Sequence, residues 1–127
     1  MSAWSAVSLP DIPPPKGPYS PAVRAGGFIY VSGQVPRDFA SGVLAGDDVA
    51  TQTRKTLSNV QTVLAQCGAT LRDVISVTVY LASVDDWGRM NAVYTEFFTA
   101  PYPSRTAIGA DLRDILVEIS VVAYVGP

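Results

Sequence analysis

The segment 47–82, "DDVATQTRKTLSNVQTVLAQCGATLRDVISVTVYLA", contains both kinds of element from which the fold is built. In its first part, apolar and small side chains recur every three or four residues: Val49, Thr53, Leu57, Val60, Leu64 and Cys67. This spacing, behind Asp47-Asp48 and ahead of Gly68, predicts an amphipathic helix with an acidic start and a glycine stop. From Asp73 to Ala82 a nearly continuous apolar run with a strand rhythm predicts a strand covered on at least one face.

The residues before this segment predict strands and an irregular region. Residues 1–9 alternate apolar and small polar side chains and fit a short first strand, and the five prolines between Pro10 and Pro18 predict extended, irregular chain. Residues 22–25 lead through Gly26-Gly27 into the aromatic and β-branched run 28–31, which is typical of a hairpin.

The residues after it predict a second helix and two last strands. A cap at residues 83–86 precedes a stripe of large apolar side chains: Trp87, Met90, Tyr94, Phe97 and Phe98. Residues 106–110 and 116–124 have the pattern of strands. The order β, β, β, α, β, α, β, β predicts an α+β two-layer sandwich, a mixed, mostly antiparallel sheet backed by two helices. We expect the other sheet face, with Tyr30, Val79 and Val121, to meet other subunits.

Length and composition narrow the classes of function. A chain of 127 residues with 48% hydrophobic side chains fits a single domain, residues 1–127. A net charge of −2 argues against binding nucleic acid or an anionic membrane, and no apolar stretch is long enough to span a bilayer. The lone Cys67 and the absence of a secretory signal pattern predict a cytoplasmic protein. With no histidine, an ordinary zinc site and a serine–histidine triad are excluded.

Two charged residues stand out as candidates for chemistry. Arg105, in "PYPSRTAIGADL" (residues 101–112), is the only charged side chain between Glu96 and Asp111. It can pair with one of these two at the surface, or the preceding prolines can aim it into a cleft. Glu118 interrupts the apolar run "ILVEISVVAYV", where a carboxylate is costly unless it is paired or faces a polar cavity. Its pattern fits an outward-facing position equally well, because Ser120 on the same face is also polar.

Weaker signals come from three more places in the chain. Tyr19 fits an anchoring aromatic, and Ser32-Gly33-Gln34 fits a turn at the end of a strand, although Gly33 also permits close approach of a ligand or a neighbouring backbone. Asn91, within the second helix, fits a solvent-facing position. None of these residues decides the function alone.

Several stretches together resemble the RidA/YjgF family of reactive-intermediate deaminases. They are "GPYSPAVRAGGFIYVSGQVP", "QTRKTLSNVQTVLAQCGATLRDVISVTVYLASVDDW", "MNAVYTEFF", "PYPSRTAIGA" and "LVEISVVAYV", in one collinear order from about Lys16 to the C-terminus. The resemblance implies a chorismate-mutase-like fold and a homotrimer with active sites between subunits. This expectation agrees with the uncovered sheet face inferred above.

The resemblance also assigns roles to residues. Arg105 corresponds to the arginine that holds a substrate carboxylate with two prongs, a geometry that a guanidinium fork matches. Glu118 corresponds to the glutamate that activates water. Positions that line the pocket are Tyr19, Ser32, Gly33 and Asn91, with backbone groups near Thr106 and Ala107 assisting proton movement.

The implied reaction is hydrolysis of a small enamine or imine, of the 2-aminoacrylate or 2-iminopropanoate type, to a 2-keto acid and ammonia, without metal or cofactor. Three departures from the family pattern bear on it: Ala107 where many members have cysteine, Ser120 where a second glutamate is common, and the altered turn 112–114. Two alternatives stay open: a ligand-binding or chaperone-like regulatory trimer with little turnover, and a deaminase of another substrate, of the aminomuconate or aminoacrylate-peracid type. An endoribonuclease, as some relatives are described, fits the acidic pI of about 4.8 poorly.

Overall fold

Six strands and two α-helices make up the computed structural model, which describes residues 3–127. Met1 and Ser2, the start of the predicted first strand, lie outside the described residues. In chain order the elements are β1 (Ser5–Ala6), β2 (Ala22–Ala25), β3 (Phe28–Gln34), α1 (Val49–Gln66), β4 (Val74–Leu81), α2 (Trp87–Phe97), β5 (Ser104–Gly109) and β6 (Val117–Tyr124). This order confirms the predicted succession of strands and helices.

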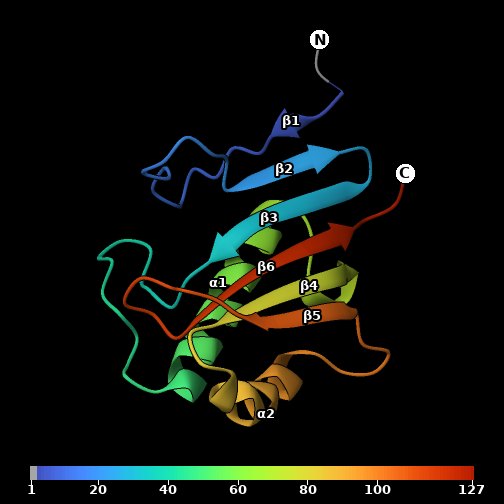
Figure 1. Ribbon diagram of the computed structural model, residues 1–127. Coiled ribbons are helices and arrows are strands. Elements are labelled where there is room, and N and C mark those ends of the chain that lie inside the picture. The colour runs from blue at the N-terminus through green and yellow to red at the C-terminus, as the bar shows by residue number, and fades with distance from the viewer. Residues whose placement is uncertain (1–2) are drawn as a thin grey trace.

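The strands form one sheet in the order β1-β2-β3-β6-β4-β5 (Figure 1). All neighbouring pairs are antiparallel except β4 and β5, which run parallel. The hairpin between β2 and β3 turns at Gly26, whose φ of 57° lies in the left-handed region that favours glycine. β5 and β6 follow each other in the chain, yet β4 lies between them in the sheet.

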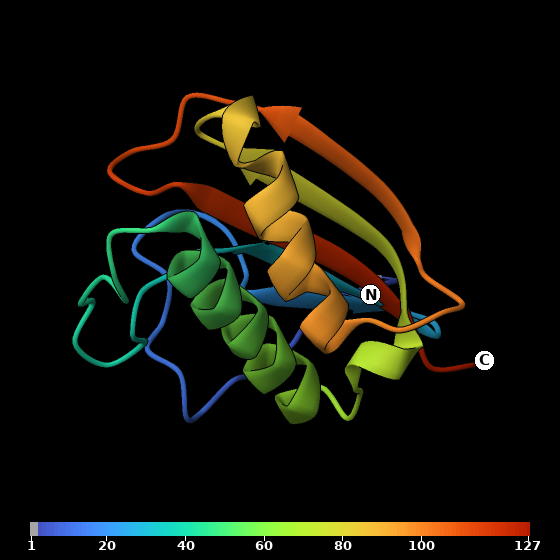
Figure 2. The ribbon, with the colours of Figure 1, turned by 90° about the horizontal axis from the view of Figure 1, so that it is seen from below.

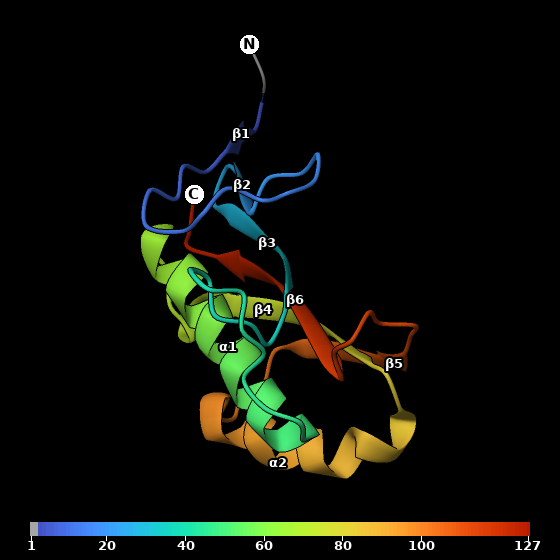
Figure 3. The same cartoon turned by 90° about the vertical axis from the view of Figure 1, so that its left-hand side faces the viewer.

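Both helices pack on one face of the sheet, as Figures 2 and 3 show, and this confirms the predicted two-layer arrangement. The side chain of Asp48 caps α1 by accepting a hydrogen bond from the backbone N–H of Thr51 at 2.9 Å. The apolar stripe of α1, with Leu57, Val60 and Leu64, is fully buried. Burial of this stripe against the sheet therefore determines which side of the sheet the helix covers.

α2 follows a short 3₁₀ turn, Val84–Asp86, which Ser83 caps. Met90 and Tyr94 of the predicted stripe are buried, and so is Phe98 at the end of the helix. The expectation that Trp87 is buried with them is wrong, because this side chain is 38% exposed. Trp87 is the first residue of α2, so its side chain lies at the exposed end of the apolar stripe.

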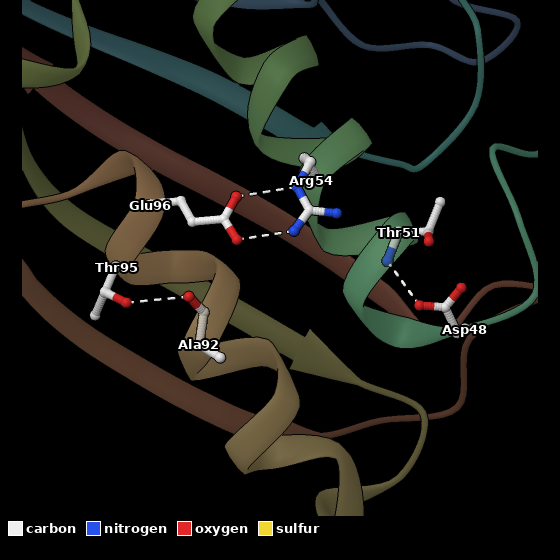
Figure 4. Close-up of polar contacts among 6 residues, drawn as sticks. All are labelled: Asp48, Thr51, Arg54, Ala92, Thr95 and Glu96. Carbon is white, nitrogen blue, oxygen red and sulfur yellow. Dashed lines mark hydrogen bonds and ion pairs between the residues drawn. The ribbon is translucent and has the colours of Figure 1, made fainter.

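An ion pair joins the two helices on their outer side. Nε and one terminal nitrogen of Arg54 on α1 donate to the two carboxylate oxygens of Glu96 on α2, at 3.0 and 2.8 Å (Figure 4). Both side chains are about half exposed, so the pair contributes little to stability. It shows, however, that Glu96 is not the partner of Arg105.

Two of the three residues that we expected on the uncovered sheet face lie on the other face. Tyr30 is 49% exposed on that face, but Val79 and Val121 are buried under the helices. The register explains the difference, because Val77 and Val121 are cross-strand partners, as are Val79 and Ile119. The helices therefore cover the more apolar alternate residues of β4 and β6, and the polar set, which includes Thr78, points the other way.

Within residues 3–127, none of the helices is long and apolar enough to cross a membrane.

Candidate active site

Arg105 lies on the edge strand β5 and is held by α2. Its Nη1 donates a hydrogen bond to the side-chain oxygen of Asn91 at 2.7 Å. The guanidinium carbon stands 4.8 Å from the centre of the Tyr94 ring, a cation–π contact. Asn91 and Tyr94 are one helical turn apart, so both reach the same point on β5. The surface pairing of Arg105 with Glu96 or Asp111 is not what the structure contains; its partners come from α2.

A cavity of about 410 Å³ opens beside this guanidinium, and we call it the arginine pocket. Its lining consists of Asn91, Tyr94, Thr95, Tyr102, Pro103 and Arg105. Among residues 3–127, neither of the two salt bridges includes Arg105. The guanidinium therefore carries a full positive charge beside a cavity, with Asn91 occupying one of its donors. Such a fork suits a carboxylate.

Tyr94 and Tyr102 were not among the predicted site residues. The sequence places Tyr94 in the apolar stripe of α2, and the structure confirms this. Its additional contact with Arg105 depends on the position of β5 beside the helix. The spacing of Asn91 and Tyr94, three residues apart on a helix, is a signal that could have found it.

Glu118 is the second residue of β6, and its half-buried side chain lies on the sheet face that the helices leave open. Burial raises the pKa of its carboxyl above the ordinary value. Neither of the two salt bridges found in residues 3–127 involves Glu118. A partly desolvated carboxylate without a cation has a raised pKa, which makes it a stronger base than an exposed carboxylate.

The backbone of β3 leaves room for this carboxylate at Gly33. A Cβ at Gly33 would overlap the Oε2 atom and carboxyl carbon of Glu118. The register between β3 and β6 shifts between Val31 and Gln34, so Gly33 lies in a β-bulge. Gly33 therefore permits a close approach, but the group that approaches is the Glu118 side chain and not the expected ligand or neighbouring backbone.

Ser32 and Tyr19 adjoin this position. The Ser32 hydroxyl donates to the carbonyl oxygen of Ser20 at 2.6 Å, which ties the segment after the prolines to β3. The Tyr19 side chain is 57% exposed and, with Gly33, lines a second cavity of about 460 Å³. We call Tyr19, Ser32, Gly33 and Glu118 the glutamate group.

Within one chain, the arginine pocket and the glutamate group lie on opposite faces of the sheet. Arg105 is the partner of Val77, which faces the helices, whereas Glu118 is the partner of Tyr80, which faces away. Arg105 and Glu118 of one chain therefore do not converge in a single crevice. Strand alternation and the intervening β4 separate them.

The two residues that follow Arg105 divide between the faces. Ala107 pairs with Val79 on the helix side, and Thr106 pairs with Thr78 on the open side. The predicted residues thus form two sets, Asn91, Arg105 and Ala107 on the helix side, and Ser32, Thr106 and Glu118 on the open side. Across residues 3–127, no group of three or more His, Cys, Asp or Glu side chains is placed to hold a metal ion.

Comparisons with known proteins identify the family. Residues 10–125 match the model of the family described as Endoribonuclease L-PSP. The chain is 42% identical to a RutC family protein of Pyrococcus horikoshii, over 90% of this chain and 92% of the relative. It is 37% identical to the 3-aminoacrylate deaminase RutC of Acinetobacter baylyi, over 94% and 97%. It is 31% identical to a 2-iminobutanoate/2-iminopropanoate deaminase of Dermatophagoides farinae, over 98% and 99%.

Solved structures give the same result. A Rid family protein of Yersinia pestis, YyfA, superposes with a TM-score of 0.88 at 32% identity, covering 97% of this chain and all of the other. RidA of an Antarctic Psychrobacter superposes with a TM-score of 0.87 at 28% identity, covering 95% and 99%. The fold and these matches define the class, and the chain belongs to the RidA/YjgF family. This family includes enamine and imine deaminases.

Proposed function

We propose that this chain is a deaminase that hydrolyses small enamines or imines, of the 2-aminoacrylate and 2-iminopropanoate type, to 2-keto acids and ammonia. Arg105 binds the substrate carboxylate, and Glu118 activates the attacking water. Tyr19, Ser32, Gly33 and Asn91 shape the pocket, with backbone groups at Thr106 and Ala107 in contact with the substrate. Two relatives whose names state such deaminations support the class of reaction.

The observation that carries the proposal is the environment of Glu118. A half-buried carboxylate without an ion-pair partner destabilises the fold, and here burial raises its pKa. The backbone also bulges at Gly33, next to the carboxylate, where any side chain would collide with it. Both features suit a base that accepts a proton from water.

The reaction follows from these groups. Water adds through its oxygen to the C=N carbon while one of its protons passes to Glu118, and the nitrogen takes up a proton from solvent. The resulting carbinolamine then loses ammonia as Glu118 returns its proton to the leaving nitrogen, and the hydroxyl proton passes to solvent as the C–O bond becomes a carbonyl. An enamine substrate first takes a proton on carbon to become the imine. Binding of the carboxylate by Arg105 fixes the carbon in front of the water.

A site that contains both Arg105 and Glu118 requires two copies of the chain, because one copy presents them on opposite faces. We therefore place the site between neighbouring subunits of a homotrimer, with Arg105 and Asn91 from one subunit and the glutamate group from the next. The exposed aromatic side chains of the open face, Phe28, Tyr30 and Tyr124, supply apolar area for such an assembly.

The test is release of ammonia and of pyruvate from 2-aminoacrylate generated in situ. The parent protein is expected to accelerate the reaction, and Glu118→Ala to lose the acceleration by about 10²–10⁴-fold, the usual contribution of a general base. A Glu118→Ala variant that is folded and as active as the parent would overturn the catalytic assignment. Running 3-aminoacrylate and an aminomuconate in parallel decides between this substrate class and that of another pathway.

A ligand-binding regulatory trimer with little turnover is the second candidate, and one observation favours it. The arginine pocket, with Asn91 and Tyr102, offers a carboxylate site that is complete without Glu118. On this reading the parent protein binds pyruvate or serine with an affinity that Glu118→Ala leaves unchanged, and ammonia release stays at the uncatalysed rate.

A further inference from the structure

The Tyr94 ring lies under the guanidinium of Arg105 and beside the arginine pocket. The ring centre is 4.8 Å from the guanidinium carbon, and Phe98 stacks on Tyr94 with ring centres 4.6 Å apart and an interplanar angle of 29°. Tyr94 is only 4% exposed, so its ring is fixed by the core. A rigid aromatic surface is thus present on one side of an otherwise flexible side chain.

We infer that Tyr94 is a positioning residue for the proposed reaction: its ring, with the Asn91 oxygen, holds the Arg105 guanidinium in the plane that receives the substrate carboxylate. This inference rests on the proposed function. Two contacts from different directions define the orientation of a planar group, one under its face and one at Nη1. The remaining donors of the fork are then preorganised, so less side-chain freedom is lost when a carboxylate binds.

The hydroxyl of Tyr94 does not take part in positioning Arg105. Within residues 3–127 its oxygen is buried and has no hydrogen-bond partner. Burial raises the pKa of the Tyr94 hydroxyl, with the Arg105 charge acting in the opposite direction. The ring itself therefore does the positioning, and removal of the hydroxyl alone is expected to leave Arg105 in place.

The experiment compares Tyr94→Phe, Tyr94→Leu and the control Phe98→Leu, which removes a neighbouring buried ring that does not lie under Arg105. We expect Tyr94→Phe to stay within about 2-fold of the parent in KM for 2-aminoacrylate and in Kd for pyruvate. Tyr94→Leu should raise both about 10-fold with kcat much less affected, as expected for lost preorganisation. Phe98→Leu should lower the melting temperature as Tyr94→Leu does, but leave KM near the parent value.

A second measurement does not depend on substrate. NMR relaxation of the Arg105 Nε–H group, assigned by its loss in Arg105→Lys, should report a rigid side chain in the parent and in Tyr94→Phe, and a mobile one in Tyr94→Leu. A rigid Arg105 in Tyr94→Leu, or equal KM changes in Tyr94→Leu and Phe98→Leu, would overturn the inference. A parent protein with ordered Arg105 but without turnover or pyruvate binding would instead reject the proposed function and leave the positioning by Tyr94 intact.

Discussion

The two faces of the sheet are made from alternate residues of the same strands, but only one face is covered by helices. On the helix side, Ile29, Val79 and Ile119 are fully buried, and the packing of α1 and α2 accounts for them. On the open side, Tyr30 is 49% exposed, and Phe28 and Tyr124 contact each other with ring centres 4.9 Å apart. The core of one chain does not require this second set, so it is the face on which a role outside folding is expected.

Arg105 and Glu118 fall on different sides of this comparison. Glu118 is on the open face, near the start of the inner strand β6, and Arg105 is at the margin of the helix face, where α2 meets the edge strand β5. Each side chain has neighbours that accommodate it. Glu118 lies against the bulge at Gly33, and Arg105 contacts Asn91 and Tyr94. Because of this separation, the proposed site needs Arg105 from one copy of the chain and Glu118 from another.

The largest expected effect is the loss of the carboxylate fork. Arg105→Ala should lower kcat/KM for 2-aminoacrylate by about 10²–10⁴-fold, because a charge-assisted hydrogen bond contributes about 1.5–3 kcal/mol and two of them are lost. The measurement is steady-state ammonia release. Arg113→Ala, which removes an exposed charge in the turn before β6, is the control and should match the parent. Equal losses in both variants would point to net charge rather than to the fork.

Mixing two inactive variants tests whether the halves belong to different chains. Arg105→Ala and Glu118→Gln subunits, unfolded together in equal amounts and refolded, should regain about a quarter of the parent activity. In a randomly mixed trimer, about one interface in four combines an intact arginine pocket with an intact Glu118. The same variants refolded separately serve as controls. Failure to regain activity, with mixed trimers verified by mass spectrometry, would place both residues in one chain's site or in none.

A smaller effect is expected at the side of the arginine pocket. Asn91→Ala removes the 2.7 Å hydrogen bond to Arg105 and should raise KM by about 3–10-fold, since one such bond contributes about 0.5–1.5 kcal/mol. Asn91 is only partly buried and lies outside the core, so the melting temperature should stay near that of the parent. An unchanged KM would mean that the Tyr94 contact suffices to hold the guanidinium.

The smallest expected effect is on stability and depends on pH. Burial disfavours the ionised form of Glu118, so its folded-state pKa lies above its unfolded value. The carboxyl therefore favours folding below the unfolded pKa, and this advantage is lost as the pH rises through the folded pKa. Relative to the parent, Glu118→Gln should be more stable at neutral pH, and the difference should shrink or vanish in acid.

Urea unfolding of the parent and of Glu118→Gln at pH 4 and pH 7.5 measures this difference. A difference of the opposite sign, with the parent more stable at pH 7.5, would mean that the carboxylate has a stabilising partner. In catalysis the same titration predicts that kcat/KM rises with pH through the pKa of Glu118 and then levels.

The sequence by itself determined the element order, the extent of α1, the hairpin at Gly26-Gly27 and the two-layer class. Each follows from local causes, namely a helical or strand period, an Asp48 cap and glycine in a turn. The sequence also singled out Arg105 and Glu118, because burying a charge is energetically costly and a charged residue within an apolar stretch can be recognised in the sequence.

Only the tertiary structure decided which alternate residues of β4 and β6 are covered, and hence that Val79 and Val121 are buried and Glu118 is not. The covered set is the more apolar one, but its burial depends on the register with β3 and β5 and on where the helices pack. The contact of Tyr94 with Arg105 and the placement of the two charges on opposite faces depend on the same non-local pairing, which no local pattern encodes.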